Sequence, residues 1–244
     1  MQKNSAYAVL ADWFEYLNQD CDYENWSQFL MMRLSAYPLK KGLDVGCGAG
    51  WFTRCFQRNG YEMTGLDVSV EMLAKAQENA RNEGLRGEYL LGDIVKTKLP
   101  RRFDFVISVN DCFNYLPTEK LSAAFKNVAS ALVKKGVFLF DVSSPKKYRE
   151  KIANTICADD REDVTYLNFI SSKDNEVTMD VTLFVRREDG AFERRDEKHV
   201  QYIHEESQVL QALEEAGFEV IDVCGHLGEE KDKSDRLCFL AQRR

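Results

Sequence analysis

The 244-residue chain lacks the features that mark secreted, metal-binding or membrane-spanning proteins. Its seven cysteines are scattered, odd in number and contain no C-x-x-C pair, which argues against a disulfide framework and against a zinc site. The first residues show no basic stretch followed by an apolar core, and no apolar run approaches about 18 residues. We therefore expect a protein of the reducing cytoplasm that has no membrane span and no metal.

Positive charge is in the minority, with 33 Lys and Arg against 40 Asp and Glu. The resulting net charge of −7 opposes broad non-specific binding to nucleic acid, although a local basic patch stays compatible with it. Short basic pairs, each more often a solvated loop or strand end, occur at 101–102, 134–135, 146–147, 186–187 and 194–195. If several converged on one site, RNA or a phosphorylated metabolite would become a credible ligand.

A glycine-rich turn stands at residues 42–50, where GLDV runs into three glycines at every second position, Gly46, Gly48 and Gly50. The segment from Trp51 begins a predicted helix, so the glycines lie between a strand and a helix. Glycine can take positive φ and lets a ligand touch bare backbone. The free N–H groups of the helix favour an anionic or carboxylate-bearing ligand. The turn therefore predicts a nucleotide site.

Two carboxylates follow at the ends of the next predicted strands. Strand 61–67 ends in Asp67, 17 positions after Gly50, near the spacing expected for an acid that binds ribose hydroxyls. Strand 87–93 ends in Asp93. Because the carboxyl ends of parallel strands meet at one edge of a sheet, we expect both acids and the turn in a single crevice.

These motifs resemble a known cofactor site. LDVGCGAG, followed by LDVSVEMLAKA and LLGDI, is similar to the site of the class I S-adenosylmethionine-dependent methyltransferases, whose acidic-x-G-x-G-x-G turn begins here at Asp44. A dehydrogenase G-x-G-x-x-G would need glycine where the chain has Trp51. YAVLADWFEYLNQDCDYENW near the start and NDCFNYL after the fourth strand resemble a subfamily of small, largely uncharacterised bacterial methyltransferases.

The resemblance implies an α/β fold, a Rossmann-like, doubly wound, seven-stranded and mostly parallel sheet with an antiparallel last strand. Residues 1–37, with helices expected over 6–17 and 22–36, would form a helical lid. Residues 38–144 and 205–244 would form the core, and 145–204 a small antiparallel β insertion after strand five that covers the acceptor site. Alternating strands are expected there over 164–170, 176–187 and 191–203, the last two joined by a hairpin turn.

The resemblance also implies a set of cofactor-binding residues. Val68 and Met72 would flank the adenine, Asp93 would meet its amino group, and Ile94 would cover its face. Tyr7 and Trp26 would lie near the sulfonium, where cation–π attraction to an aromatic face contributes about 0.5 to 2 kcal/mol. The plainer alternatives are packing of the aromatics on the sheet, core contacts for Val68 and Met72, and a turn role for Asp93. The full set is Tyr7, Trp26, Asp44, Gly46, Gly48, Gly50, Asp67, Val68, Met72, Asp93, Ile94 and Asn110.

No catalytic residue is assigned from the sequence. Methyl transfer depends chiefly on alignment, and a base is needed only if the acceptor arrives protonated. His199 and His204 are the titratable candidates, but a solvated strand histidine is the commoner explanation of either. Asp111 and Tyr115 either face the acceptor or order their loop. The Asn/Asp-Pro-Pro-aromatic tetrad of methylases that act on base amino groups is absent from NDCFNY.

The sequence thus predicts a methyltransferase that uses S-adenosylmethionine, releases S-adenosylhomocysteine and methylates a small molecule. Three alternatives stay open. They are a tRNA or RNA methyltransferase, a nicotinamide-dependent oxidoreductase, and a module that binds the cofactor without catalysis. Both a monomer and a homodimer are compatible with the sequence.

Overall fold

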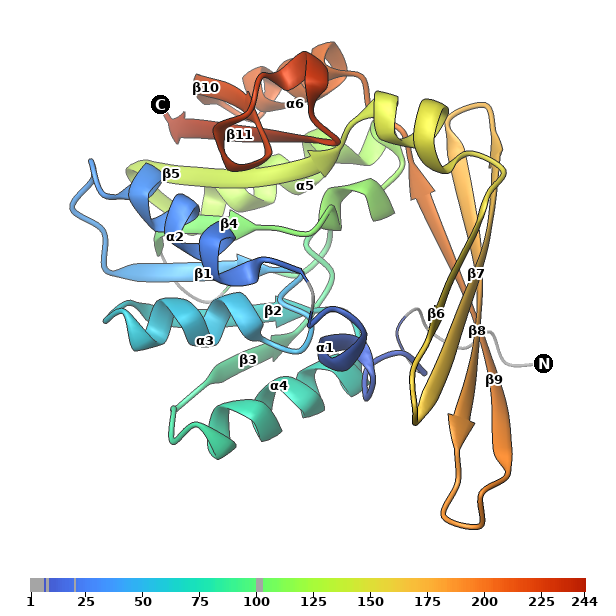
Figure 1. The fold of residues 1–244 in the computed structure, drawn as a ribbon. Coiled ribbons are helices and arrows are strands. Elements are labelled where there is room, and N and C mark those ends of the chain that lie inside the picture. Colours follow the sequence, from blue (N-terminus) through green and yellow to red (C-terminus); the bar gives the residue numbers. More distant parts are fainter. Residues whose placement is uncertain (1–6, 8, 20, 100–102) are drawn as a thin grey trace.

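Two sheets organise the computed structural model, which describes residues 7, 9–19, 21–99 and 103–244. The larger has seven strands in the order β10-β11-β5-β4-β1-β2-β3, and the smaller has four in the order β6-β7-β8-β9 (Figure 1). In the larger sheet β11 runs antiparallel to both β10 and β5, and the remaining pairs are parallel. This confirms the predicted fold class. The strands of the larger sheet are β1 (Lys41–Val45), β2 (Glu62–Asp67), β3 (Glu88–Leu91), β4 (Phe103–Ser108), β5 (Leu132–Ser143), β10 (Phe218–Gly225) and β11 (Arg236–Arg243).

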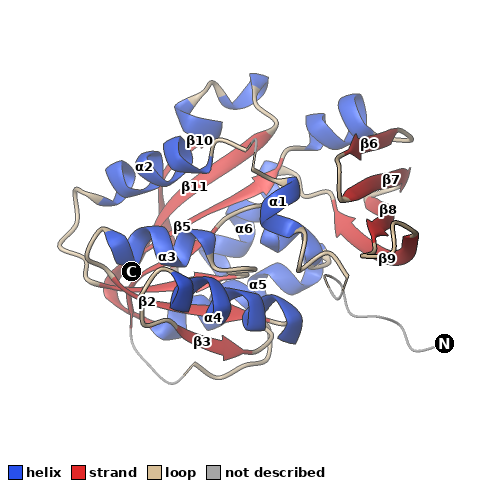
Figure 2. Ribbon diagram, turned by 60° about the horizontal axis from the view of Figure 1, so that its bottom comes forward, coloured by secondary structure: helices blue, strands red, loops and turns tan. Residues whose placement is uncertain are grey.

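Helices cover both faces of the larger sheet, with α2, α3 and α4 on one face and α5 and α6 on the other (Figure 2). Their bounds are α1 (Phe14–Leu17), α2 (Tyr23–Leu34), α3 (Trp51–Arg58), α4 (Val70–Asn82), α5 (Thr118–Ala131) and α6 (Glu206–Glu215). Asp22 and Ser69 begin α2 and α4 by accepting N–H groups of the first turn, as N-cap residues do. Short single turns occur at η1 (Cys112–Tyr115), η2 (Lys147–Ile152), η3 (His226–Gly228) and η4 (Lys231–Lys233).

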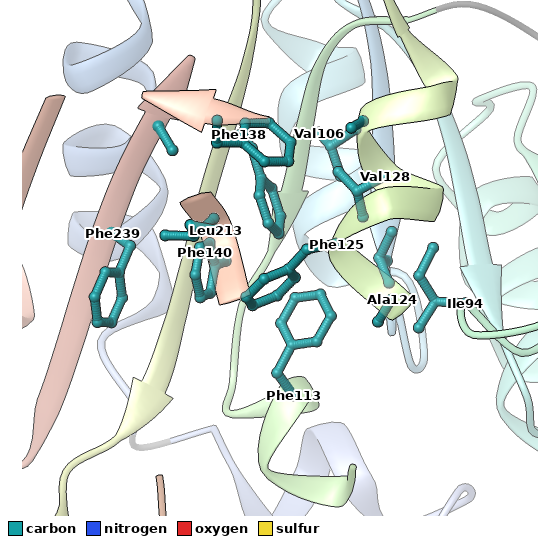
Figure 3. Packing of buried hydrophobic residues seen from close by; sticks show 14 of the residues in the cluster. Ile94, Val106, Phe113, Ala124, Phe125, Val128, Phe138, Phe140, Leu213 and Phe239 are labelled. Atoms are coloured by element: carbon teal, nitrogen blue, oxygen red, sulfur yellow. The ribbon is translucent and has the colours of Figure 1, made fainter. Parts of the chain in front are cut away.

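The core on the α5 side of the sheet is built largely from phenylalanine. Phe113, Phe125, Phe138 and Phe140 are fully buried and their rings contact one another, with Phe239 stacked on Phe140 at 5.0 Å (Figure 3). Burying one such side chain contributes about 1.5 to 3 kcal/mol. This packing holds the carboxyl ends of β4 and β5 in place, and the loops that follow them therefore have a rigid base.

The smaller sheet stands beside the larger one and comprises β6 (Ile156–Asp160), β7 (Val164–Lys173), β8 (Glu176–Arg186) and β9 (Phe192–Tyr202) (Figure 1). It confirms the predicted antiparallel insertion, and Gly190 at φ +81° forms the predicted turn between β8 and β9. Strand β6 was not predicted. Its sequence, ICADD, is short and mostly exposed, and it lacks the alternation of apolar and polar residues that marks the other three strands.

The N-terminal segment corrects one prediction. The expected helix over 6–17 is confined to Phe14–Leu17, while Tyr7 has a left-handed φ of +69° and turns fill most of the interval. The N–H groups of Tyr7, Val9 and Leu10 are hydrogen-bonded to Glu197 of β9, and a helix would have directed them elsewhere. Residues 6 and 8 lie outside the described part of the chain.

Membrane spans were sought among the helices of the described residues. None is both long enough and apolar enough to cross a bilayer.

Candidate active site

The glycine turn forms the floor of a cavity of about 560 Å³. A side chain built on Gly48 would approach only Met72 Sδ, at 4.0 Å, so this glycine opens onto the cavity. Gly50 is different, because it does not line the cavity and a Cβ there would meet Tyr89 Oη at 2.8 Å and Ala76 at 3.0 Å. Gly50 therefore allows α3 and α4 to pack closely, and Gly46 makes room for Cys112, whose side chain a Cβ there would meet. Gly48 presents backbone to the open cavity.

Asp67 stands at the end of β2 beside this floor. Its Oδ2 accepts the N–H of Gly48 at 2.9 Å, and its Oδ1 accepts the N–H of Ser69 at 2.9 Å. Burial raises the pKa of Asp67, and the N–H groups of Ser69, Gly48 and Val68 partly oppose that rise. A carboxylate has about four acceptor sites, so after these N–H groups it keeps acceptor capacity for a hydroxyl group of a ligand.

Asp44 supplies a second carboxylate to the cavity. Thr53 Oγ1 donates to its Oδ2 at 2.6 Å, but its Oδ1 is buried and has no hydrogen-bond partner among the described residues. Burial raises the pKa of Asp44 to about 7, against the hydrogen bond from Thr53. An unsatisfied buried acceptor of this kind is costly to fold and fits a ligand that brings a donor or a positive charge.

The loop after β4 forms the opposite wall. Asn110 and Asp111 both have left-handed backbone, with φ of +65° and +52°. Strained residues of this sort gather at functional sites. Arg236 of β11 donates to Asp111 at 2.9 Å and to Asp141 at 2.6 Å, and its guanidinium lies 4.8 Å from the Trp26 ring. Burial opposes ionisation of Asp111, yet Arg236 and Lys147 outweigh it and lower its pKa.

The smaller sheet and the N-terminal segment close the far end of the cavity. The strands contribute a mostly apolar wall with a few polar groups, and the segment contributes Tyr7, Leu10 and Phe14. Asn168 Oδ1 on β7 is buried without a hydrogen-bond partner among the described residues. Lining residues from the smaller sheet include Tyr166, Asn168, Ile170, Met179, Val181, His199 and Gln201.

Comparison with known proteins identifies the family. A methyltransferase-domain model matches residues 43–136. Over 245 residues the chain is 31% identical to a protein of Geobacillus sp. (strain WCH70) named as a methyltransferase, covering 97% of this chain and 99% of that one. It is equally identical to YqeM of Bacillus subtilis (strain 168), likewise named as a methyltransferase, with 97% of each chain covered.

A solved structure agrees with these relatives. The S-adenosylmethionine-dependent methyltransferase of Clostridium acetobutylicum ATCC 824 superposes with a TM-score of 0.87 at 26% identity, covering 95% of this chain and 96% of that one. The chain belongs to the S-adenosylmethionine-dependent methyltransferases. A glycine/sarcosine N-methyltransferase of Aphanothece halophytica is 30% identical over 110 residues, but the match covers only 44% of this chain and 42% of that one.

The methyltransferase cavity contains most of the residues predicted to bind the cofactor. Tyr7, Asp44, Gly46, Gly48, Asp67, Val68, Met72, Ile94 and Asn110 line it, whereas Trp26, Gly50 and Asp93 do not. Trp26 is buried behind the wall against Phe52, His226 and Arg236. The Asp93 carboxylate accepts the N–H of Val95 at 2.8 Å and lies 3.3 Å from Lys96 Nζ, which is the turn role considered as the alternative.

The groups that the cofactor needs are present in this cavity. Asp67 keeps acceptor capacity for a ribose hydroxyl, Asp44 Oδ1 awaits a donor, and Gly48 leaves room for a ligand above the turn. When bound, S-adenosylmethionine supplies an activated methyl group on a sulfonium. The residues that line the cavity would hold that cofactor, and methyl transfer would then depend chiefly on alignment of the acceptor with it.

Both strand histidines correct the expectation of a solvated side chain. His199 is 3% exposed and lines the cavity, and His204 is fully buried. His204 has a structural role, because its Nε2 lies 3.1 Å from the carbonyl of Phe113 and its Nδ1 lies 3.0 Å from Thr118 Oγ1. The buried face of β9 thus carries polar side chains, which the alternating pattern of the predicted strand did not indicate.

Sequence reasoning missed several residues of the cavity. Tyr23 accepts a hydrogen bond from Asn110 at 2.9 Å, and Arg236 holds Asp111, yet both reach the cavity from distant parts of the chain. A signal did exist for Glu197, His199 and Gln201, which alternate on the same face of β9 as the buried Ile203. Three polar residues on an apolar face indicate a polar site beneath that face.

Proposed function

We propose that this chain transfers the methyl group of S-adenosylmethionine to a small-molecule acceptor. The observation that carries the proposal is a single continuous cavity, which runs from the glycine turn and Asp67 to the wall formed by the smaller sheet. In this proposal the adenosyl group lies over the turn between Asp67, Met72 and Ile94. The acceptor lies against the smaller sheet, under the segment of residues 7–17.

The size of the cavity supports a small acceptor. A volume of about 560 Å³ is in the range of small-molecule sites. The glycine/sarcosine N-methyltransferase, which is similar to this chain over 110 residues, is itself named for small acceptors.

The basic pairs give RNA little support. Those of the smaller sheet do not line the cavity, and each described arginine of these pairs faces a carboxylate. The partners are Glu162 for Arg186, Asp189 for Arg187, Asp196 for Arg194 and Glu193 for Arg195. Of the remaining pairs, Lys147 does line the cavity, and residues 101–102 lie outside the described part of the chain.

Replacement of Asp67 tests the proposed cofactor site. Titration calorimetry with S-adenosylhomocysteine should show that Asp67→Ala weakens binding by about 1.5 to 3 kcal/mol, because charge-assisted bonds to the ribose are lost. Asp67→Asn keeps an acceptor for the N–H of Gly48 and should lose less. Glu78→Ala removes an exposed carboxylate of α4 that pairs with Lys75, so it is the matched control and should bind normally. Unchanged affinity in Asp67→Ala would remove the role assigned to this residue.

A further inference from the structure

Three side chains form a hydrogen-bonded chain at the acceptor end of the cavity, and the carboxylate of Glu197 lies against the last of them. Tyr7 Oη lies 2.7 Å from Tyr115 Oη, and Tyr115 Oη lies 3.1 Å from His199 Nδ1. His199 Nε2 in turn lies 2.5 Å from Glu197 Oε1. Tyr7, Tyr115 and His199 line the cavity, whereas the Glu197 side chain is 1% exposed.

The protonation of the two ends gives this chain a direction. Burial raises the pKa of both Tyr7 and Tyr115, so the two phenols keep their protons. Burial would also raise the pKa of Glu197, but the hydrogen bond from His199 and the N–H groups of Val9 and Tyr7 outweigh it and lower that pKa. Glu197 is therefore an anion in close contact with His199 Nε2, and this contact favours a proton on that nitrogen.

The remaining hydrogen positions follow from the number of donors. With its proton on Nε2, a neutral His199 can only accept at Nδ1, so Tyr115 donates to it. Tyr115 has then used its only hydrogen, and Tyr7 must donate to the oxygen of Tyr115. The Tyr7 oxygen is left with lone pairs alone, and it is the end of the chain that can accept a proton from a ligand in the cavity.

We propose that Tyr7, Tyr115 and His199 relay a proton away from the methyl acceptor, and that the acceptor atom is consequently a hydroxyl oxygen or an amine nitrogen that carries hydrogen. This inference rests on the proposed methyl transfer. The acceptor's lone pair forms the new bond to the methyl carbon while the carbon–sulfur bond breaks and leaves its electron pair on sulfur. The acceptor's proton passes to Tyr7 as the Tyr7 proton moves to Tyr115 and the Tyr115 proton moves to His199 Nδ1.

Glu197 then stabilises the resulting imidazolium without taking the proton. An acceptor that has no proton to lose, such as a carboxylate, a tertiary amine or a thioether, would have no use for this relay. The arrangement thus narrows the acceptor class within the proposed function.

A purely structural role for the same groups makes a different prediction. In that case the chain of bonds only holds the segment of residues 7–17 against β9. His199→Gln separates the two roles, because a glutamine amide can accept from Tyr115 and donate to Glu197 but cannot carry a proton onward. His226→Gln, outside the cavity, is the matched control.

Nitrogen NMR of the protein labelled with ¹⁵N-histidine tests the relay without an acceptor. The protein has three histidines, and His199→Gln assigns the resonance of interest. With S-adenosylhomocysteine present, we expect hydrogen on Nε2 of His199 and a bare Nδ1 whose shift changes in Tyr115→Phe. Hydrogen on Nδ1, in either the neutral tautomer or the imidazolium, would overturn the relay because that nitrogen could receive nothing.

Methyl labelling tests the acceptor class. The enzyme is incubated with cofactor carrying a ¹³C-methyl group and a bacterial metabolite extract, and the carbon shift identifies the new bond. An ether-type O–CH₃ or an N–CH₃ product supports the inference if His199→Gln forms it about 100-fold more slowly than the wild type and binds S-adenosylhomocysteine normally. An ester, a quaternary ammonium, a sulfonium product, or an undiminished rate in His199→Gln overturns it.

The proposed function fails separately. No labelled product in any extract, or no binding of S-adenosylhomocysteine, would overturn methyl transfer itself and the relay with it. A labelled product that His199→Gln forms as fast as the wild type would leave the methyltransferase assignment intact and overturn only the relay.

Discussion

At the scale of single residues, the buried carboxylate of Asp44 links folding to pH. Its pKa is raised to about 7 in the folded protein, from an ordinary 3.8. The folded state therefore holds a proton that the unfolded chain has released between these two values. The contribution of Asp44 is most favourable below about pH 4 and is lost as pH rises to about 7.

We expect Asp44→Asn to remove this dependence. The wild type should lose at most about 1.4 kcal/mol of unfolding free energy per pH unit through Asp44 over that interval. The variant has no proton to lose there, and its amide oxygen can still accept from Thr53. Urea unfolding of both proteins at pH 5.5 and pH 7.5 measures the difference, which should favour the variant more at the higher pH. A difference that does not change with pH would show that Asp44 is ionised throughout.

The sequence predicts the position of Asp44 in the site but not its hydrogen bonding or its pKa. The motif places an acid at the end of β1, and the comparison with relatives supports the motif. Whether that acid is paired or left with a free oxygen depends on Thr53 and on burial by neighbouring elements. Those are tertiary facts that no spacing encodes.

At the scale of elements, Arg54 joins three parts of the fold. Its guanidinium donates to the carbonyl of Ala49 in the glycine turn, to Glu15 of α1 and to Glu83 at the end of α4. The Arg54 side chain is 4% exposed, while its two carboxylate partners are 32% exposed. Removal of this side chain leaves its three acceptors without a donor, although water can partly reach the two carboxylates.

Arg54→Met should therefore lower the unfolding free energy by about 2 to 3 kcal/mol, below the full cost of breaking a buried pair. Arg58→Met is the matched control, because Arg58 also pairs with Glu83 but is 43% exposed. It should cost under about 1 kcal/mol. Equal losses in the two variants, measured by urea unfolding, would mean that Arg54 acts only through Glu83.

Glu197 attaches the N-terminal segment to the smaller sheet. Three main-chain N–H groups converge on its carboxylate, and hydrogen bonds to a charged group are worth about 1.5 to 3 kcal/mol each. In Glu197→Ala we expect amide exchange over residues 9–17 to accelerate more than tenfold, while exchange in β1 stays unchanged. Glu193→Ala, an exposed position on the same strand, is the control. Unaltered exchange in Glu197→Ala would show that apolar packing alone holds the segment.

The elements differ in how far the sequence predicts them. Segments with strong local signals, such as the helix predicted over 22–36 and the hairpin turn at Gly190, lie close to those observed. The predicted helix over 6–17 is wrong for most of that interval, because Glu197, which is distant in sequence, accepts N–H groups that a helix would direct elsewhere. Likewise, the expectation of a solvated His199 is wrong because the sequence of a strand does not reveal which other elements cover each of its faces.

At the scale of the whole molecule, ligand preference separates the methyltransferase from the nicotinamide-dependent alternative. Both folds place an acid at the end of the second strand, so Asp67 alone does not discriminate. Trp51 does, since it lines the cavity at the position where a dehydrogenase turn has its last glycine. An indole there narrows the space over α3 that a pyrophosphate occupies in dinucleotide-binding proteins.

S-adenosylhomocysteine should consequently stabilise the entire chain and NADH should not. A ligand at 100 times its dissociation constant adds about 2.7 kcal/mol, which for a protein of this length raises Tm by about 5 to 10 °C. Scanning calorimetry of the wild type with each ligand measures this, and Asp67→Ala should give a smaller shift at the same concentration. This rise in Tm applies to the whole protein only if the two sheets unfold together in one transition. Two transitions, of which the ligand shifts one, would show that the sheets unfold as separate units. An equal shift with NADH would show that the turn binds adenine nucleotides without regard to the sulfonium.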